Sequence, residues 1–346
     1  MRVAILTVRV PFIHGGAEEL ASGLLYQLKL RKVDADLLSI PFKWHPPESI
    51  LDCMNLGRNV DLTGINGVKI DRLITLKFPA YYSEHENKCL WLIHQHRQAY
   101  DLYGTENGDL HHSKIGNEVT SKIKDWDDAL IPEHQDIFTI SQKVTSRLEN
   151  FNSIESNVLR PPPAHPEKFH FKSTEDFILA PGRFDPLKRQ MEILEAMSDI
   201  DSRLKLIFIG QDNSSYGNEC KKRAEELNLL NRIQFMGVVG ENEKNDLYSR
   251  CYCVYNGVFD EDYGYITVEA FLSSKPTIVF ADCGGPLEFI DNEINGLVVN
   301  SNAELSEVIN KLYSNKKLAV SLGYEGKNKL KEMNLNWDHV IDRLLS

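Results

Sequence analysis

Two carboxylates separated by seven residues are the first candidates for chemistry in this 346-residue sequence. They are Glu261 and Glu269, and between them the chain is expected to pass from a loop into a helix. Glu269 then falls about one turn into that helix, where its side chain can point back toward the preceding strand. Carboxylate oxygens placed in this way suit the hydroxyl groups of a ribose or another sugar.

Two cationic side chains could provide the positive charge that binds a diphosphate. Arg183 and Lys188 follow a predicted strand at 177–180. When a bond to phosphate breaks, negative charge grows on the departing group, and fixed cations stabilise that charge more in the transition state than in the ground state. Taken alone, an exposed Arg and Lys would more often be solvated side chains without a function.

Two glycine pairs could present backbone amides to the same ligand. Gly284 and Gly285 precede Pro286 at a plausible first helical position, so their N–H groups are expected to be free to approach phosphate or sugar oxygens. Gly15 and Gly16 could present backbone N–H groups in the same way near the amino terminus. Either pair alone would be weak, because glycine pairs are most often plain turns.

The segment 91–100 places three further polar side chains at the end of a predicted strand. His94 or His96 could bind a hydroxyl group of a ligand or assist proton transfer, and Arg97 could bind a phosphate or another anionic group. A core histidine with satisfied hydrogen bonds is an equally good interpretation of His94. Which of the two histidines faces the substrate stays open.

The elements around these residues predict an α/β fold with two doubly wound domains. Apolar runs typical of buried parallel strands alternate with segments of helical spacing in both halves of the chain. Ligands of such sheets bind outside the carboxyl ends of the strands, where all the candidate residues fall. The predicted strands are 2–7, 35–40, 72–76, 88–94, 136–140, 177–180, 204–210, 232–237, 251–255, 277–281 and 297–299. The predicted helices are 17–32, 189–198, 217–229, 265–274, 302–313 and 317–333.

A stiff connector divides the two predicted domains. Residues 160–169 contain four prolines, which favours an extended linker. We therefore expect one domain at 1–163, a second domain at 164–333, and a final helix at about 334–346 that packs back on the first domain.

Composition narrows the classes of partner. The formal net charge of -11 opposes the broad phosphate neutralisation that nucleic-acid binding requires. The six cysteines show no CxxC spacing, so reduced buried thiols are expected, and the Cys251/Cys253 pair is a poor metal site. No apolar stretch predicts a membrane span, which favours the cytoplasm. The basic run 29–32 suits either peripheral contact with the inner membrane face or a solvated helix end.

At this point the motifs resemble a known family. The carboxylate segment 260–270 with 284–288 resembles family 4 of the GT-B glycosyltransferases, the retaining glycosyl transferases group 1. The likeness covers most of the chain and includes Gly15-Gly16-Ala17-Glu18, Gly182-Arg183, Lys188, Gly210, Gly237 and Asn295-Gly296-Leu297-Val298. It implies two Rossmann-like domains with a cleft between them, namely an acceptor-side domain at 1–163 and a nucleotide-sugar-binding domain at 164–333.

The resemblance also assigns roles. Glu269 would bind the nucleotide ribose, and Glu261 would contact the donor sugar near its reacting carbon. The catalytic residues implied are Arg183, Lys188, Glu261, His94 and His96, with Arg97 on the acceptor side. The implied donor-binding residues are Gly15, Gly16, Gly210, Val238, Asp262, Tyr263, Gly264, Tyr265, Ile266, Glu269, Cys283, Gly284 and Gly285.

The function implied is transfer of a hexose from a nucleotide diphosphate sugar, with UDP-glucose expected first and GDP-mannose next. The acceptor would be a glycan or a lipid-linked intermediate of polysaccharide biosynthesis. The resemblance implies metal-independent catalysis without a cofactor, so the D-x-D string at 260–262 is interpreted as a decoy. A sugar-nucleotide epimerase or hydrolase, and a non-catalytic sugar-nucleotide sensor, remain alternatives. An oxidoreductase ranks last, because no G-x-G-x-x-G follows the first strand.

Three segments depart from the family pattern: Asn256-Gly257, Pro161-Pro162 and Lys77-Phe78-Pro79. They leave the details of the substrate open.

Overall fold

The computed structural model describes residues 1–13 and 15–346, which divide into two compact units. Unit 1 contains Met1–Ala164 and Asn336–Ser346, and unit 2 contains His165–Leu335. The chain thus passes from unit 1 to unit 2 inside the proline-rich segment 160–169. None of the described helices is long and apolar enough to cross a membrane.

Unit 1 is built on a six-stranded parallel sheet with the order β2-β1-β5-β6-β7-β8. Its strands are β1 Arg2–Arg9, β2 Asp34–Pro41, β5 Arg72–Thr75, β6 Lys88–Leu92, β7 Asp136–Thr139 and β8 Asn157–Val158. A small hairpin adds β3 Gly64–Ile65 and β4 Val68–Lys69. The helices are α1 Gly16–Leu30, α2 Glu48–Arg58, α3 Lys114–Leu130, α4 Gln142–Asn152 and α11 Trp337–Leu345.

The continuous apolar run of β1 explains its place inside this sheet. All six residues between Arg2 and Arg9 are buried, as expected of a parallel strand with both faces covered. Backbone hydrogen bonds from Leu76 to Leu6 and from Ile93 to Leu76 continue the pairing just beyond β5 and β6. The carboxyl ends of β1, β5 and β6 therefore lie side by side.

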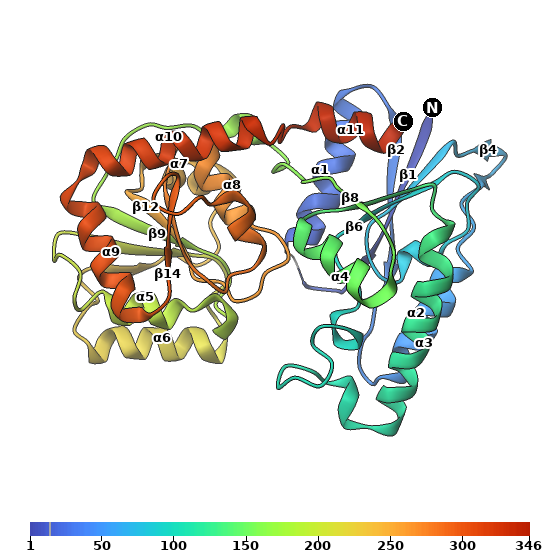
Figure 1. The fold of residues 1–346 in the computed structure, drawn as a ribbon, viewed down its shortest axis with the longest axis horizontal. Helices are drawn as coiled ribbons and strands as arrows, with labels where there is room; N and C mark the ends of the chain where they lie inside the picture. Colours follow the sequence, from blue (N-terminus) through green and yellow to red (C-terminus); the bar gives the residue numbers. More distant parts are fainter. Residues whose placement is uncertain (14) are drawn as a thin grey trace. The chain divides into compact units, whose positions relative to one another are not determined.

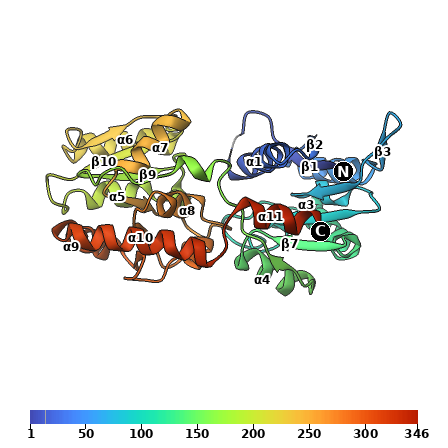
Figure 2. The ribbon, with the colours of Figure 1, turned by 90° about the horizontal axis from the view of Figure 1, so that it is seen from above.

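The last helix belongs to unit 1, where α11 lies close to α1 (Figures 1 and 2). Trp337 donates its indole N–H to the carbonyl of Pro163 at 2.8 Å and meets Trp91 edge to face. Arg31 of α1 forms an ion pair with Asp338. A side chain at Gly23 of α1 would collide with Ala164, so a glycine there lets the linker pass close to the helix.

Unit 2 has a second six-stranded parallel sheet with the order β11-β10-β9-β12-β13-β14. Its strands are β9 Phe177–Pro181, β10 Lys205–Ile209, β11 Ile233–Phe235, β12 Cys253–Asn256, β13 Thr277–Phe280 and β14 Gly296–Val299. Its helices are α5 Gln190–Ala196, α6 Ser215–Glu226, α7 Glu241–Arg250, α8 Tyr265–Leu272, α9 Asn302–Ser314 and α10 Lys316–Glu332. Short 3-10 helices include η6 Pro186–Lys188 and η7 Gly285–Phe289 in unit 2, and η2 Arg97–Ala99 in unit 1.

Alternate residues of the unit 2 strands enter two separate apolar cores, one on each face of the sheet. Ile178 joins the core that contains α5, α6 and α9, whereas the next residue, Leu179, joins the core that contains α7 and α8. Phe208 and Ile209 of β10 divide in the same way. Because helices cover both faces of the sheet (Figure 1), a ligand is expected at the carboxyl ends of its strands.

Candidate functional site

The carboxyl edge of the unit 2 sheet gathers the loops in which the sequence predicts donor binding. Gly182 follows β9 and donates its amide to Ile209 at 2.9 Å, and Gly210 follows β10 and donates to Gly237 at 2.8 Å. At Gly210, φ is 129°, and a Cβ there would lie 2.3 Å from the carbonyl oxygen of Gly182. Only glycine permits this close approach of two strand-end loops.

Lys188 and Glu261 meet at the centre of this edge. Lys188 ends η6, a short 3-10 helix that Asp185 caps by accepting the amide of Leu187 at 3.0 Å. The ammonium of Lys188 lies 2.6 Å from Oε1 of Glu261, and both side chains are partly buried. Two residues predicted to act at one reaction centre are thus in direct contact, and each neutralises the charge of the other.

Arg183 is held far more loosely. Its side chain is 60% exposed, and its guanidinium is 3.5 Å from Asp185. Its backbone carbonyl is fixed by the side-chain amide of Gln190 at 3.0 Å. The backbone is therefore anchored at the strand edge while the cation can turn toward a ligand.

The glycine pair after β13 differs from its prediction. Gly285 donates its amide to the carbonyl of Glu261 at 2.7 Å, and Glu261 donates its own amide to Cys283 at 2.9 Å. The expectation of a free amide at Gly285 is therefore wrong, because that group joins the two loops. A Cβ on Gly285 would lie 2.7 Å from the carbonyl oxygen of Asp262, so glycine is needed for the loops to touch. The pair fixes the carboxylate loop in place.

Glu269 lies on α8 and forms an ion pair with Lys244 of α7 at 2.8 Å. Only 12% of the Glu269 side chain is exposed. Tyr248, also on α7, is fully buried, and its burial followed by the charge of Glu269 raises the pKa of its phenol well above the usual value. Glu269 is thus a rigidly held carboxylate with its countercharge supplied by a neighbouring helix.

The other predicted donor-binding residues of unit 2 differ in how far their side chains are exposed. Val238 is 79% exposed after β11, where an apolar ligand surface could cover it. Ile266 reaches toward Gly182, and Gly264 packs against Pro286. Tyr263 and Cys283 are buried: Tyr263 meets Phe289 and Tyr265 edge to face, and burial raises the pKa of the Cys283 thiol to about 12. Their side chains support the loops from inside.

In unit 1 the predicted acceptor-side residues make contacts with neighbouring residues of the same unit. His94 lies with Nδ1 2.6 Å from the carbonyl of Gln95. His96 packs between Phe78 and Phe42, with ring centroids 5.0 and 6.0 Å away. Burial lowers the pKa of His96 to about 3, so its imidazole is neutral at physiological pH.

Arg97 and the first glycine pair are also engaged. Arg97 is bound to Asp101 at 2.6 Å, a carboxylate that it shares with Arg147 at 3.3 Å. Gly15 donates its amide to the Glu18 carboxylate at 2.9 Å in a capping box, and Gly16 begins α1. The expectation that the Gly15 amide is free for a ligand is therefore wrong, because the helix uses it to close its own first turn.

Comparison with known proteins identifies the unit that carries this edge. Residues 163–329 match the family described as glycosyl transferases group 1. Unit 2 belongs to the glycosyl transferases group 1 family. Its matched segment spans nearly the whole of His165–Leu335.

Curated relatives of this group 1 domain include mannosyltransferases. Human alpha-1,3/1,6-mannosyltransferase ALG2 is 26% identical over 176 residues, which are 46% of this chain and 42% of the relative. An uncharacterized glycosyltransferase from Methanocaldococcus jannaschii is 29% identical over 168 residues, covering 48% and 46%. O-antigen chain mannosyltransferase C of Escherichia coli is 25% identical over 180 residues, covering 50% and 47%. The matches thus span less than half of each relative.

Solved structures show that the whole chain has the GT-B fold. Sucrose-phosphate synthase from Thermosynechococcus elongatus superposes with a TM-score of 0.78 at 16% identity, covering 99% of this chain and 97% of its own. Anabaena HepE in complex with UDP-glucose gives a TM-score of 0.69 at 13% identity, covering 99% and 98%. At these identities the likeness establishes the fold alone.

The group 1 domain also contains two cations that sequence reasoning missed. Lys244 lies on α7, whose charged sequence has no apolar stripe to reveal a helix. Arg189 binds Asp282 through two hydrogen bonds of 2.6 and 2.7 Å and stacks on Phe280 at 4.8 Å. Arg189 directly follows Lys188, so this anchor fixes the backbone next to the central ion pair.

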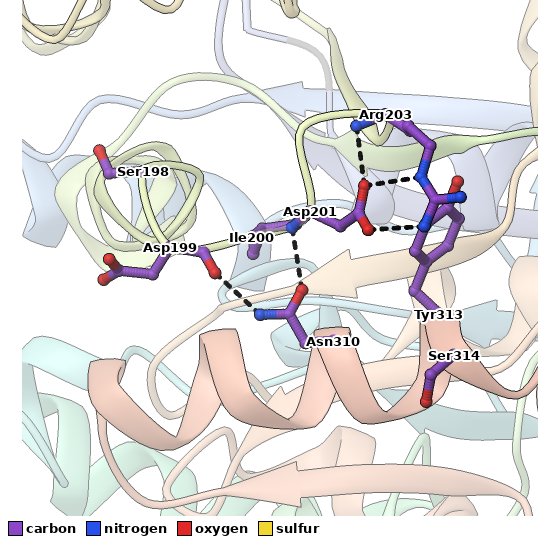
Figure 3. Close-up of a pocket in the computed structure, with 8 residues that line it drawn as sticks. All are labelled: Ser198, Asp199, Ile200, Asp201, Arg203, Asn310, Tyr313 and Ser314. Carbon is purple, nitrogen blue, oxygen red and sulfur yellow. Dashed lines mark hydrogen bonds and ion pairs between the residues drawn. The ribbon is translucent and has the colours of Figure 1, made fainter.

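Within the described residues, neither a metal cluster nor the pocket lined by Asp199, Asp201 and Arg203 coincides with the site. In residues 1–13 and 15–346 no three His, Cys, Asp or Glu side chains gather closely enough to hold a metal ion. A pocket of about 400 Å³ lies before β10, at the opposite edge of the group 1 sheet from the glycine loops. There Asn310 bonds the backbone of Asp199 and Asp201, and Arg203 bonds Asp201, so these polar groups satisfy one another (Figure 3).

Proposed function

We propose that the chain is a retaining glycosyltransferase that moves a hexose from a nucleotide diphosphate sugar to a glycan or lipid-linked acceptor. The observation that carries the proposal is the group 1 family match over the unit in which Lys188 and Glu261 are paired, beside Arg183, at the carboxyl edge of a parallel sheet. Ligands of such sheets bind at this edge.

In the proposed reaction Glu269 accepts hydrogen bonds from the ribose, and Arg183 and Lys188 stabilise the diphosphate. Glu261 contacts the donor sugar close to its reacting carbon. As the glycosyl bond breaks, its electron pair goes to the β-phosphate oxygen, and the acceptor oxygen attacks from the same face. The phosphate takes the acceptor proton, so the configuration of the sugar is retained.

The structure changes one part of this scheme. The Gly285 amide is used inside the fold, so Arg183 and Lys188 carry a larger share of the phosphate charge than the glycine loop does. Gly284 has φ of 79° and sits beside Glu261 in the isolated bridge that joins the loops. The glycines thus contribute mainly by positioning Glu261.

The sugar donor is proposed as UDP-glucose, with GDP-mannose as the second candidate. The second candidate is favoured by the names of the curated relatives, several of which are mannosyltransferases. Catalysis is proposed to need no metal ion. A cytoplasmic location is proposed because all six cysteines are buried thiols without a disulfide, which suits a reducing compartment.

A thermal-shift screen with UDP, GDP, ADP and their hexose conjugates tests the proposal, because a ligand of the native state raises the melting temperature. Product analysis with radiolabelled donor and a panel of acceptors follows for any donor that binds. Transfer with retained configuration supports the enzyme. Epimerised or hydrolysed donor would indicate the alternative enzymes, and binding without turnover across the panel would indicate a sensor.

A further inference from the structure

Arg189, the residue after Lys188, has a backbone conformation that a non-glycine residue adopts only at a cost. Its φ of 51° and ψ of 43° place it in the left-handed region, where the Cβ crowds the following carbonyl. Such residues persist where the surrounding structure fixes them, and they are frequent at functional sites. The contacts that hold Arg189 also bear on Lys188, because the two residues share a peptide bond.

The backbone of Arg189 is held from β12. Tyr255 is 2% exposed and donates its hydroxyl to the carbonyl of Arg189 at 2.7 Å. Gly257 makes room for this bond, since a Cβ there would lie 2.1 Å from the hydroxyl oxygen. Gly257 belongs to a segment that departs from the family pattern. The departure thus leaves space for a buried hydrogen bond directly after Lys188.

The side chain of Arg189 is held from the loop after β13. Its guanidinium donates to both carboxylate oxygens of Asp282, at 2.6 and 2.7 Å. It also lies over the rings of Phe280 and Phe259, 4.8 and 5.2 Å from their centroids. Bidentate pairing fixes the orientation of the two groups as well as their distance. Asp282 therefore neutralises the cation and holds it in one place.

The loop that carries Glu261 is bonded to both of its neighbours. Phe259 donates its amide to the carbonyl of Leu187 at 2.7 Å, which joins this loop to η6. Asp260 donates its amide to the carbonyl of Asp282 at 3.0 Å, which joins it to the loop after β13. The three loops thus form one hydrogen-bonded frame, from which the two members of the central ion pair project toward each other.

We propose that Tyr255 and Asp282 are positioning residues that act through Arg189 to hold Lys188 at the diphosphate of the donor. Lys188 ends a 3-10 helix of three residues, which is too short to be stable by itself. A cation fixed before the reaction stabilises a departing phosphate without reorganisation. The task of the held lysine rests on the proposed glycosyltransferase function, whereas the contacts that hold it do not.

Amide hydrogen exchange in the full chain tests the holding contacts without a substrate. The Phe259 amide is the reporter, because its bond to Leu187 joins η6 to the carboxylate loop. Tyr255→Phe and Asp282→Asn should each speed its exchange by roughly tenfold or more, since each variant loses a hydrogen bond that keeps the loops together. Unchanged exchange in either variant would overturn the proposal.

Two matched substitutions control for the loss of a buried hydroxyl and of a bidentate carboxylate. Tyr252→Phe removes a buried hydroxyl that donates to a backbone carbonyl at 2.6 Å in the same unit. Asp201→Asn removes a carboxylate that binds Arg203 through both oxygens at the other edge of the sheet. Neither control should change the exchange of the Phe259 amide. Equal increases in all four variants would reflect a general loss of stability and would count against the proposal.

Steady-state kinetics of glycosyl transfer separates positioning from donor binding. Tyr255→Phe and Asp282→Asn should lower kcat by roughly tenfold, while KM for the donor changes by less than about threefold, because Lys188 acts on charge that develops as the bond breaks. A rise in KM with kcat unchanged would contradict a positioning role. If the Phe259 amide responds as expected but the wild type transfers no sugar, the holding contacts stand and the proposed function fails.

Arg189→Gly distinguishes the side-chain anchor from the backbone conformation. Glycine adopts the left-handed region without a steric cost, so this variant keeps the turn but loses the contact with Asp282. Its melting temperature should stay close to that of the wild type, and its kcat should fall about as far as that of Asp282→Asn. A wild-type kcat in Arg189→Gly would show that the turn alone places Lys188, and the role of Asp282 would be refuted.

Discussion

Replacing Lys188 with Met is expected to lower kcat/KM for glycosyl transfer by about two orders of magnitude. Lys188 is partly buried and lies 2.6 Å from Glu261. A unit charge about 5 Å from a departing phosphate contributes roughly 3 kcal/mol at an effective dielectric constant of about 20, since 332/(20 × 5) is about 3.3. Because about 1.4 kcal/mol corresponds to a factor of ten, the expected loss is roughly 200-fold.

The same substitution also leaves Glu261 without its cation. An unpaired carboxylate would repel a diphosphate, so the loss in Lys188→Met contains two effects. The Lys188→Met/Glu261→Gln double variant separates them, because it removes the repulsion but not the need for a cation. We expect the double variant to recover less than about tenfold of the rate lost in Lys188→Met.

Initial rates of product formation are measured with the donor found by screening. The wild type, Lys188→Met, Glu261→Gln and the double variant together form the double-mutant cycle. Lys222→Met is the matched control, because Lys222 forms an exposed ion pair with Glu226 on α6. Melting temperatures of all variants should remain close to that of the wild type. If the double variant reached the rate of Glu261→Gln alone, Lys188 would serve only to neutralise Glu261, and its role at the phosphate would be refuted.

Three further predictions concern other parts of the molecule. Glu269→Ala should weaken nucleotide diphosphate binding by roughly tenfold, as expected for a lost charged hydrogen bond, and unchanged affinity by calorimetry would remove Glu269 from the site. EDTA should leave the transfer rate unchanged, and a rate restored only by added Mg²⁺ would contradict metal-independent catalysis. Burial raises the pKa of Asp127 from 3.8 to about 6, although Tyr81, Tyr82 and Tyr100 all donate hydrogen bonds to it. The folded state therefore holds this proton more tightly, so its contribution to the free energy of unfolding is full below about pH 4 and falls by up to about 3 kcal/mol as the pH rises past 6. Asp127→Asn should lack that fall in denaturant titrations, and identical pH profiles would show that Asp127 does not titrate in this range.

The unit 2 edge could be predicted from sequence because parallel strands bring their following loops together. The apolar runs at 177–180 and 277–281 predict two parallel strands, which places Arg183, Lys188 and Gly284 at the same end of a sheet. The ion pair of Lys188 and Glu261 could not be predicted, because it depends on η6 and the carboxylate loop meeting across β9 and β12, which no local pattern encodes.

Lys244, the ion-pair partner of Glu269, was not predicted because the sequence of α7 does not show a helical pattern. Its sequence is mostly charged or polar, and its buried residues include Asn245 and Ser249 as well as Leu247 and Tyr248. Without an apolar stripe at helical spacing, no helix is indicated. The glycine pair at 284–285 shows a related limit: composition reveals that a backbone can approach closely, but not whether its amide is already bonded.

Arg97 shows which property of a site residue lies beyond the sequence. Arg97 had the position and the charge expected of an acceptor-side residue, yet Asp101, four residues later, binds it at 2.6 Å. A strand end predicts where a cation lies. Whether that cation is available to a ligand depends on which carboxylates the tertiary fold brings within reach.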